Sequence, residues 1–361
     1  MANDHALLAG GGSGGHVFPA LAVAEELRQR GWQVSWMGRM SGIEKELVEA
    51  RGLPYYGLSA KAVVGRGPFQ KVAALGTLAA SSWRAKQIIR SSKASVVLGT
   101  GGYVSVPGVL GAALNKRPIV LLEPNAEAGS ANRWLSRWAS SAAVAQPGME
   151  GQLRCPSRVT GVPVRREFFE ARDTRPARGA LRLLVLGGSQ GARQLNHLVP
   201  SALEQLGHRL GGLEVVHQVG EALLDEAEST YRKSDLRGQK ARVVPFLDDV
   251  AAEMAAADLV ISRAGAITVA EICAAGRAAL LVPLALAGGH QVANAHRMAA
   301  SGGAVVLPPE KADVPNLVTL LESLLGDRQR LRAMGHTLHG LAWPQAAESV
   351  ADLLREAVEA A

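Results

Sequence analysis

The sequence predicts an α/β protein with two Rossmann-like domains, each a doubly wound parallel sheet, facing a cleft. Short apolar runs alternate with helical patterns along the whole 361-residue chain, as successive βαβ units require. The first apolar run of each half ends in a glycine-rich turn. Between the halves, residues 161–180 are rich in Arg, Glu, Pro and Asp and lack apolar periodicity, so we expect an interdomain linker there.

The expected domains are residues 1–164 and 165–345, followed by a C-terminal helix within 346–361. In the first domain we expect helices at 20–30 and 43–51, and strands at 5–9, 33–37, 55–58, 96–99, 118–122, 141–145 and 158–160. In the second we expect strands at 181–186, 214–217, 242–244, 259–262, 279–282 and 304–307. In such folds ligands bind at the carboxyl ends of the strands.

The composition limits the kinds of protein that this chain can be. Apolar residues make up 48% of the chain and charged residues 20%, as in a soluble globular protein. Cys155 and Cys273 lie far apart without metal-binding spacing, which favours a reducing cytosol. We expect no signal peptide, because the N-terminus lacks the charged start, long apolar core and cleavage site of one. We expect no membrane-spanning helix, because no apolar run approaches ~18 residues. Aromatic residues make up only 4%, which argues against an aromatic platform for nucleic acid.

Positive charge is concentrated in the first half. Residues 1–164 carry 18 Lys and Arg against 9 Asp and Glu, whereas residues 165–361 carry 21 against 23. No acidic residue occurs between Ala50 and Leu122, a window with 10 basic residues. Such a basic face is typical of proteins that bind a polyanion: a nucleic acid, an anionic membrane or a phosphate-bearing substrate. A solvated surface without a partner is the alternative.

Glycine-rich turns follow the expected strands at 5–9, 96–99 and 181–186. At the start of a helix, free backbone N–H groups without a Cβ nearby favour a phosphate. The first turn contains Gly10-x-Gly12-x-x-Gly15, which matches the dinucleotide fingerprint. The next strand, however, ends in Gly38-Arg39 where an acid would hold a ribose hydroxyl, which argues against NAD. An ordinary glycine-rich turn is the alternative for any one of these motifs.

Motifs along nearly the whole chain stand in the order and spacing of one family. They are GGGSGGHVFPALAVA (10–24), GTGGYVSVPG (99–108), GVPVR (161–165), VLGGSQGARQLN (185–196), PFLDDVAA (245–252), DLVISRAGAITVAEICAAG (258–276) and HQVANA (290–295). In this ordered set the chain resembles the MurG family of peptidoglycan glycosyltransferases, in glycosyltransferase family 28. A single glycine loop is common, but this combination is specific.

The resemblance implies a GT-B fold and an inverting transfer of N-acetylglucosamine (GlcNAc). The donor would be UDP-GlcNAc, and the acceptor would be the C4 hydroxyl of undecaprenyl-diphospho-muramoyl-pentapeptide, the step from lipid I to lipid II of peptidoglycan synthesis. A role in cell wall biogenesis, cell shape and cell division would follow. The resemblance also implies no cofactor, no essential metal, no nucleic acid partner and peripheral binding to the cytoplasmic face of the cell membrane. The lack of an Asp-x-Asp motif agrees with a metal-free route.

Most donor contacts that the resemblance implies lie in the second half. Glu271 would accept hydrogen bonds from the ribose hydroxyls. The alternative is an acidic residue in the first turn of a helix, where the helix dipole favours it. Phe246 would lie beside the nucleotide, although such a Phe is more often a core residue. Arg165 would bind phosphate through its forked donors. The expected donor set is Ser13, Gly14, Gly15, Asn125, Arg165, Ser189, Phe246, Leu247, Ala266, Ile267, Thr268, Val269, Ala270, Glu271, Gln291 and Asn294.

The first two glycine turns are expected to bind the acceptor diphosphate. Their residues in this role are Gly12, Ser13, Gly14, Gly15, Gly101, Gly102 and Tyr103. His16 is the candidate base, because imidazole is the usual proton acceptor at neutral pH. A structural histidine bonded to backbone at the helix start is the alternative for His16. Glu123, at the end of an expected strand, is the rival base.

The segment 66–84 combines apolar residues at helical spacing with basic residues. It is typical of an interfacial helix on an anionic membrane, with a helix that packs its apolar stripe on the sheet as the alternative. The expected membrane residues are Arg66, Phe69, Lys71, Val72, Leu75, Leu78, Trp83 and Arg84.

The chain departs from the family pattern at several positions near the expected sites. These are Leu122, Pro124, Val162, Gly288, Gly289 and His290, which leaves the fine geometry of sugar and acceptor recognition open. Two other functions fit parts of the sequence. A UDP-GlcNAc epimerase of the same fold would need no lipid acceptor, and a basic nucleic-acid binder would need a recognition motif that the sequence lacks.

Overall fold

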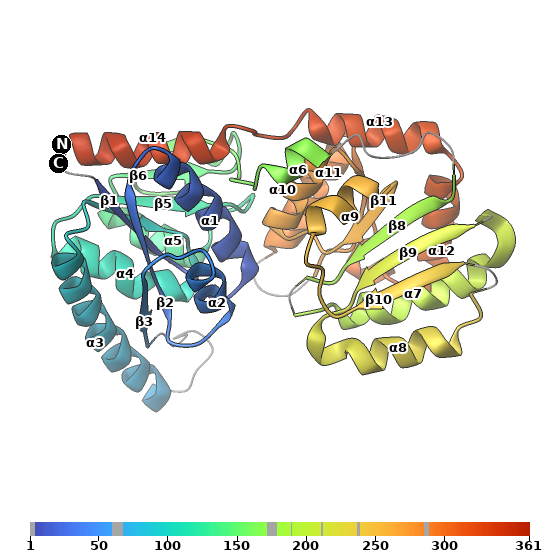
Figure 1. The fold of residues 1–361 in the computed structure, drawn as a ribbon, viewed down its shortest axis with the longest axis horizontal. Helices are drawn as coiled ribbons and strands as arrows, with labels where there is room; N and C mark the ends of the chain where they lie inside the picture. The colour runs from blue at the N-terminus through green and yellow to red at the C-terminus, as the bar shows by residue number, and fades with distance from the viewer. Residues whose placement is uncertain are drawn as a thin grey trace. The chain divides into compact units, whose positions relative to one another are not determined.

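The computed structural model describes residues 4–59, 68–171, 179–188, 190–210, 212–236, 239–284 and 289–361, with side chains left out of the description at 68–74, 208 and 210. The chain divides into two compact units (Figure 1). Unit 1 comprises Met1–Val164 together with Trp343–Ala361, and unit 2 comprises Arg165–Ala342. The C-terminal segment therefore belongs to the same unit as the N-terminus.

Unit 1 is built on a seven-stranded parallel sheet of order β3-β2-β1-β4-β5-β6-β7. Its strands are β1 (His5–Ala9), β2 (Gln33–Arg39), β3 (Tyr55–Leu58), β4 (Val96–Gly99), β5 (Ile119–Glu123), β6 (Ser141–Val144) and β7 (Ser157–Val159). The strand order reverses between β1 and β4, which pair directly from Ala6 with Val96 to Ala9 with Gly99. Such a reversal is where doubly wound sheets bind their ligands.

Helices cover both faces of this sheet. They are α1 (Gly14–Gln29), α2 (Ile43–Glu49), α3 (Pro68–Ser92), α4 (Gly102–Leu114), α5 (Ser130–Leu135) and α14 (Ala346–Glu359). One core joins α1 and α14 to the sheet, with Leu21, Val350 and Leu354 fully buried. The opposite core joins α3 and α4 through Ile89 and Val109.

Unit 2 repeats the plan with a six-stranded parallel sheet of order β10-β9-β8-β11-β12-β13. Its strands are β8 (Leu181–Leu186), β9 (Leu213–Gln218), β10 (Lys240–Val244), β11 (Leu259–Ser262), β12 (Ala278–Leu281) and β13 (Ala304–Val306). Here the order reverses between β8 and β11, paired from Leu259 with Leu183 to Ser262 with Leu186. The expected fold class, two Rossmann-like parallel sheets, is confirmed.

The helices of unit 2 are α6 (Glu167–Glu170), α7 (Arg193–Leu206), α8 (Leu224–Lys233), α9 (Val250–Ala256), α10 (Ala266–Ala275), α11 (His290–Ala300), α12 (Val314–Leu325) and α13 (Arg328–His339). One core packs α7, α12 and α13 on the sheet through Val199, Leu321 and Leu331. On the other face α9 lies against β8 and next to α10 (Figure 1).

Two local expectations differ from the structure, although the boundary between the units, at Val164 and Arg165, does fall in the stretch expected as a linker. Helix α1 begins at Gly14, not near residue 20, so Ser13 is its N-cap and His16 lies in its first turn. Gly and Pro have the lowest helix propensities, and the burial of Val17 and Leu21 on the sheet overrides them. The stretch expected as a linker also contains the short helix α6, whose Phe168 is fully buried.

Candidate functional site

In unit 1, the first two glycine turns lie on the two strands that flank the reversal of strand order. The first follows β1 and leads into α1, and the second follows β4 and leads into α4. Gly101 and Gly102 adopt φ of 83° and 68°, a region that side chains disfavour. The N-termini of both helices therefore stand at the same reversal, where they offer unpaired N–H groups to an anion.

His16 lies between these two turns. Its Nδ1 donates a hydrogen bond to the Thr100 carbonyl at 2.8 Å, and a Cβ placed on Gly102 would be 3.0 Å from its Nε2. Because a carbonyl oxygen only accepts, the proton of the neutral ring is on Nδ1 and Nε2 is left as the acceptor. Burial lowers the pKa of His16, and the charge of Glu123 opposes that shift. A neutral imidazole with Nε2 unprotonated has the protonation state that a general base needs.

Glu123, the rival base, is a buried carboxylate with many donors. It accepts hydrogen bonds from the Asn125 backbone N at 3.1 Å, Asn125 Nδ2 at 2.9 Å, Gly129 N at 2.8 Å and Asn132 Nδ2 at 3.0 Å. These bonds hold the loop after β5 in place. Proton abstraction by Glu123 would compete with four donors, so the geometry favours His16 of the two predicted bases. The same bonds tie the Asn125 side chain to Glu123.

In unit 2, the corresponding turns follow β8 and β11. Gly265 is the N-cap of α10, and the N–H of Val269 already donates to the Gly265 carbonyl at 2.9 Å. The amides that α10 leaves open to a ligand are therefore those of Ala266, Ile267 and Thr268, whereas those of Val269 and Ala270 lie within the helix ladder. Ser189, expected to bind phosphate in the turn after β8, lies outside the described residues.

Glu271 and Arg165 form an ion pair one turn into α10. Arg165 Nη2 lies 3.5 Å from Glu271 Oε1, and Arg165 Nη1 lies 3.3 Å from Glu167 Oε1. The Arg165 guanidinium also stacks over the Phe168 ring at 4.9 Å. Burial raises the pKa of Glu271 to about 7, against the opposing charge of Arg165. The structure thus brings two expected donor residues together, and burial favours the protonated form of the carboxyl.

The other expected donor residues have mixed surroundings. Phe246 follows β10 and is 48% exposed, so the core alternative is wrong for it, whereas its neighbour Leu247 is buried. Gln291 Oε1 accepts a hydrogen bond from Leu284 N at 3.0 Å. Asn294 Nδ2 donates to the Ala264 carbonyl at 3.0 Å and so braces the turn before α10. Of the positions that depart from the family pattern, Gly288 lies outside the described residues, and Gly289 is the N-cap of α11.

One braced cation was missed from the sequence. Arg263 follows β11, and its Nη1 donates to Gln194 Oε1 and to the Val282 carbonyl, both at 3.1 Å. Burial lowers the pKa of Arg263. It links the turn before α10 to the first turn of α7 and to the end of β12. Its position in the motif was the only available signal, because the partners are far apart in sequence.

Helix α3 carries most of the residues that were expected at a membrane. Leu75 and Trp83 are 55% and 57% exposed, and Lys86 Nζ lies 4.8 Å from the centre of the Trp83 ring. A hollow of about 540 Å³ between α3 and α4 is lined by Leu75, Leu78, Leu114 and Trp138, among others. Arg66 and the side chains of Phe69, Lys71 and Val72 lie outside the described residues.

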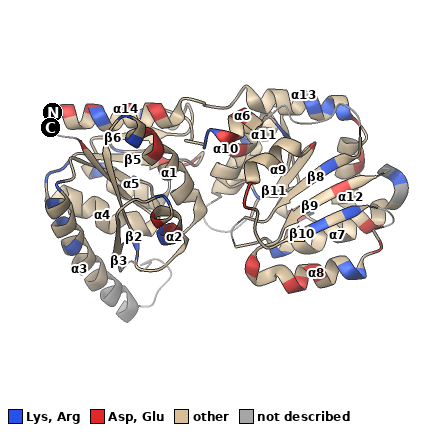
Figure 2. Ribbon diagram, viewed as in Figure 1, with Lys and Arg blue, Asp and Glu red and all other residues tan. Residues whose placement is uncertain are grey.

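The charge on α3 is of one sign. In Figure 2 the described part of this helix carries basic residues and no acidic ones. The alternative, a helix that packs on the domain, holds for its other side, where Ala85 and Ile89 are buried. No helix in the described part of the chain is long and apolar enough to cross a membrane.

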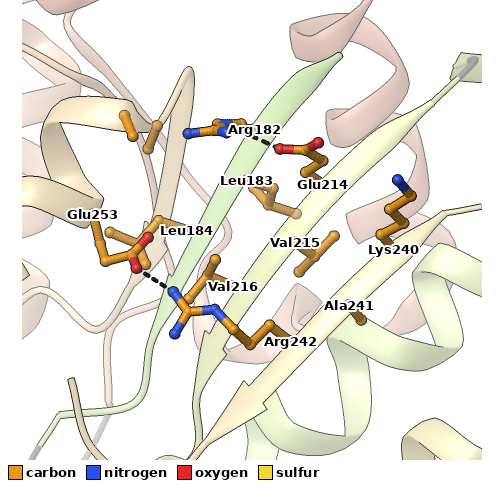
Figure 3. A pocket seen from close by; sticks show the side chains of 12 residues that line it. Arg182, Leu183, Leu184, Glu214, Val215, Val216, Lys240, Ala241, Arg242 and Glu253 are labelled. Atoms are coloured by element: carbon orange, nitrogen blue, oxygen red, sulfur yellow. Dashed lines mark hydrogen bonds and ion pairs between the residues drawn. The ribbon is translucent and has the colours of Figure 1, made fainter. Parts of the chain in front are cut away.

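A second hollow lies on strands β8, β9 and β10 of unit 2 (Figure 3). Its charged side chains pair with one another: Arg182 Nε lies 2.9 Å from Glu214 Oε2, and Arg242 pairs with Glu253. Arg182 stands near the amino end of β8, away from the carboxyl ends where α7 and α10 begin. This hollow is therefore separate from the expected donor site. Among the described residues, no group of three or more His, Cys, Asp or Glu could hold a metal ion.

Comparison with known proteins identifies the family. The model of the glycosyltransferase family 28 N-terminal domain matches residues 6–144, and that of the family's C-terminal domain matches residues 182–353. The chain belongs to glycosyltransferase family 28. The turns at both reversals of strand order fall within the matched residues.

Relatives of this family 28 chain span its full length. UDP-N-acetylglucosamine--N-acetylmuramyl-(pentapeptide) pyrophosphoryl-undecaprenol N-acetylglucosamine transferases from Halorhodospira halophila and Stutzerimonas stutzeri are 43% and 44% identical, over 97% of this chain and 97% and 98% of theirs. The crystal structure of Acinetobacter baumannii MurG is 34% identical, with a TM-score of 0.78 over 98% of this chain and 99% of that one. A glycosyltransferase from Rickettsia africae, 12% identical with a TM-score of 0.70, shares the fold.

Proposed function

We propose that this chain transfers GlcNAc from UDP-GlcNAc to undecaprenyl-diphosphate-linked muramoyl-pentapeptide, the step from lipid I to lipid II. The observation that carries the proposal is the identity of over 40%, along nearly the whole chain, with transferases named for this reaction. The site geometry supports it, because each unit presents helix N-termini at the reversal of its sheet, as two diphosphate ligands would need.

Unit 2 would hold the donor. The open amides of Ala266, Ile267 and Thr268 can meet the diphosphate or a sugar hydroxyl, and Glu271 can accept the ribose hydroxyls. When the bond to the sugar breaks, negative charge grows on UDP. The α10 N-terminus and Arg165 can stabilise that charge, because they are fixed before the reaction begins.

Unit 1 would hold the acceptor and the base. The N-termini of α1 and α4 can bind the acceptor diphosphate, and His16 Nε2 can take the proton of the C4 hydroxyl. The hydroxyl oxygen then attacks the anomeric carbon from the face opposite UDP, which inverts the configuration. The Thr100 carbonyl assists indirectly, because its bond to Nδ1 keeps Nε2 unprotonated.

The exposed side of α3 would place this unit on the lipid that carries the acceptor. Leu75 and Trp83 supply apolar surface, while Arg84 and Lys86 supply charge opposite in sign to anionic head groups. We infer a peripheral enzyme at the cytoplasmic face of the cell membrane, where UDP-GlcNAc is available to it.

Incubation with radiolabelled UDP-GlcNAc, with and without a lipid-linked muramoyl-pentapeptide, tests the reaction. The expected result is a disaccharide-lipid and free UDP that form only with the acceptor. Formation of the 2-epimer of the sugar without acceptor would instead identify an epimerase. The Glu271→Ala variant tests the donor site in the same assay, because loss of the ribose contact should raise the KM for UDP-GlcNAc.

A further inference from the structure

Arg39, the last residue of β2, forms hydrogen bonds with four residues, two through its side chain and two through its backbone. Its Nη1 donates to the Tyr103 hydroxyl at 3.3 Å, and its Nε donates to the Ser41 carbonyl at 3.1 Å. Its backbone N donates to Glu44 Oε1 at 3.3 Å, and the Tyr55 hydroxyl donates to its carbonyl at 2.6 Å. The side chain is nevertheless 37% exposed. It is therefore both fixed and accessible to a ligand.

Glu44 supplies a buried negative charge behind this arginine. The residue is fully buried, and its Oε1 lies 3.9 Å from Arg39 Nε. Within the described residues, its Oε2 has no hydrogen-bond partner. A buried carboxylate is costly unless a countercharge compensates it, so Glu44 favours a guanidinium that stays close to it. Sequence patterns alone did not indicate this pair, apart from the missing ribose acid at the end of the strand.

The cluster joins the two glycine turns of unit 1. A Cβ on Gly11 would lie 2.5 Å from Glu44 Oε1, so Glu44 packs directly against the first turn. Tyr103 lies in the first turn of α4, directly after the second glycine turn. The Arg39 guanidinium is thus linked through Glu44 to the first glycine turn and through Tyr103 to the first turn of α4. Its Nη2 makes no hydrogen bond to any residue that the structure describes.

We propose that Arg39 binds the diphosphate of the acceptor and that Glu44 is its positioning residue. The proposal rests on the proposed function and adds a specific cation to it. Helix N-termini supply only partial charges, whereas a guanidinium supplies a full charge and forked donors that match phosphate oxygens. It also explains why β2 ends in a base rather than an acid: the group recognised at this edge is an anion, not a ribose.

Geranyl diphosphate, a short soluble diphosphate, tests the inference without turnover. Arg39→Ala should weaken its binding, measured by calorimetry, by about tenfold or more, the worth of one hydrogen bond to a charged group. The KM for the acceptor should rise to a similar extent, while the KM for UDP-GlcNAc stays unchanged. Arg39→Lys should lose less. Lys45→Ala, which removes an exposed charge from the neighbouring helix α2, is the matched control and should leave both quantities unchanged.

Glu44→Gln tests the positioning role. It should raise the KM for the acceptor several-fold with little change in kcat, because the guanidinium remains but is less well held. Thermal unfolding checks that each variant folds, and Arg39→Gln replaces Arg39→Ala if the latter does not.

Unchanged geranyl diphosphate affinity in a folded Arg39→Ala variant would overturn the inference, even if the acceptor KM rose, because Arg39 would then contact the peptide instead. A wild-type protein that binds geranyl diphosphate through Arg39 but transfers no GlcNAc would contradict only the proposed function.

Discussion

Affinity for UDP-GlcNAc should depend on pH through Glu271. Burial raises the pKa of this carboxyl to about 7 in the unliganded protein. The ionised carboxylate offers both of its oxygens as acceptors to the two ribose hydroxyls. In the neutral form one oxygen carries a proton and acts as a donor. Raising the pH from 6 to 8 should therefore strengthen donor binding, and the affinity should level off above the pKa.

The magnitude follows from the pKa. With a pKa near 7, about a tenth of the carboxyl is ionised at pH 6 and about nine-tenths at pH 8, so the dissociation constant should fall about tenfold, or ~1.4 kcal/mol. Isothermal titration calorimetry with UDP-GlcNAc measures it cleanly, because the diphosphate diester has no group that titrates in this range. UDP itself is unsuitable, since its terminal phosphate does.

Glu271→Gln should bind more weakly at pH 8 and show no such pH dependence. The same variant checks the linkage to stability. A carboxyl whose folded pKa exceeds its unfolded value destabilises the folded state as the pH rises from about 4.5 to 7. Replacement by Gln should therefore raise the free energy of unfolding at pH 8 by up to about 3 kcal/mol. A wild-type affinity that is flat between pH 6 and 8, or a variant with the same slope, would refute this reasoning.

Three further changes have defined outcomes. His16→Gln should lower kcat by about 10² to 10⁴ with little change in either KM. Because burial lowers the pKa of His16, the wild-type kcat should fall only at a pH below the usual titration range of histidine. A rise in both KM values with an unchanged kcat would instead indicate a binding role. The double variant Trp83→Ser and Leu75→Ser should cosediment less with anionic liposomes. Phe246→Ser, which removes an exposed aromatic side chain of the other unit, should cosediment as the wild type does. Full cosedimentation of the double variant would show that α3 does not contact the membrane. Gly111→Ala should lower the free energy of unfolding by about 1–3 kcal/mol, because the new Cβ would lie 2.7 Å from the Cβ of Ala85 in α3. An unchanged melting temperature would contradict that packing.

The sheets could be predicted closely, because strands buried on both faces of a parallel sheet are short continuous apolar runs. Leu181–Leu186 and Leu259–Ser262, for example, have the bounds that were expected from the sequence. The start of α1 could not be predicted, because glycines and a proline disfavour a helix locally and only packing on the sheet decides its extent.

The site residues could be predicted where a motif places them on one turn, as with Glu271 in α10 or His16 after the first glycine turn. Contacts that set their chemistry could not. The Thr100 carbonyl that fixes the His16 ring is 84 residues away in sequence, and Arg39 reaches Tyr103 across 64 residues. Such pairs depend on which strands are neighbours, and a local pattern of residue types does not contain that information.

A crystal structure grown with UDP-GlcNAc tests the central claim most directly. The account predicts the diphosphate at the amides of Ala266 to Thr268 and both ribose hydroxyls on the Glu271 carboxylate. A nucleotide bound to the N-termini of α1 and α4 instead, with Glu271 still paired only to Arg165, would contradict it.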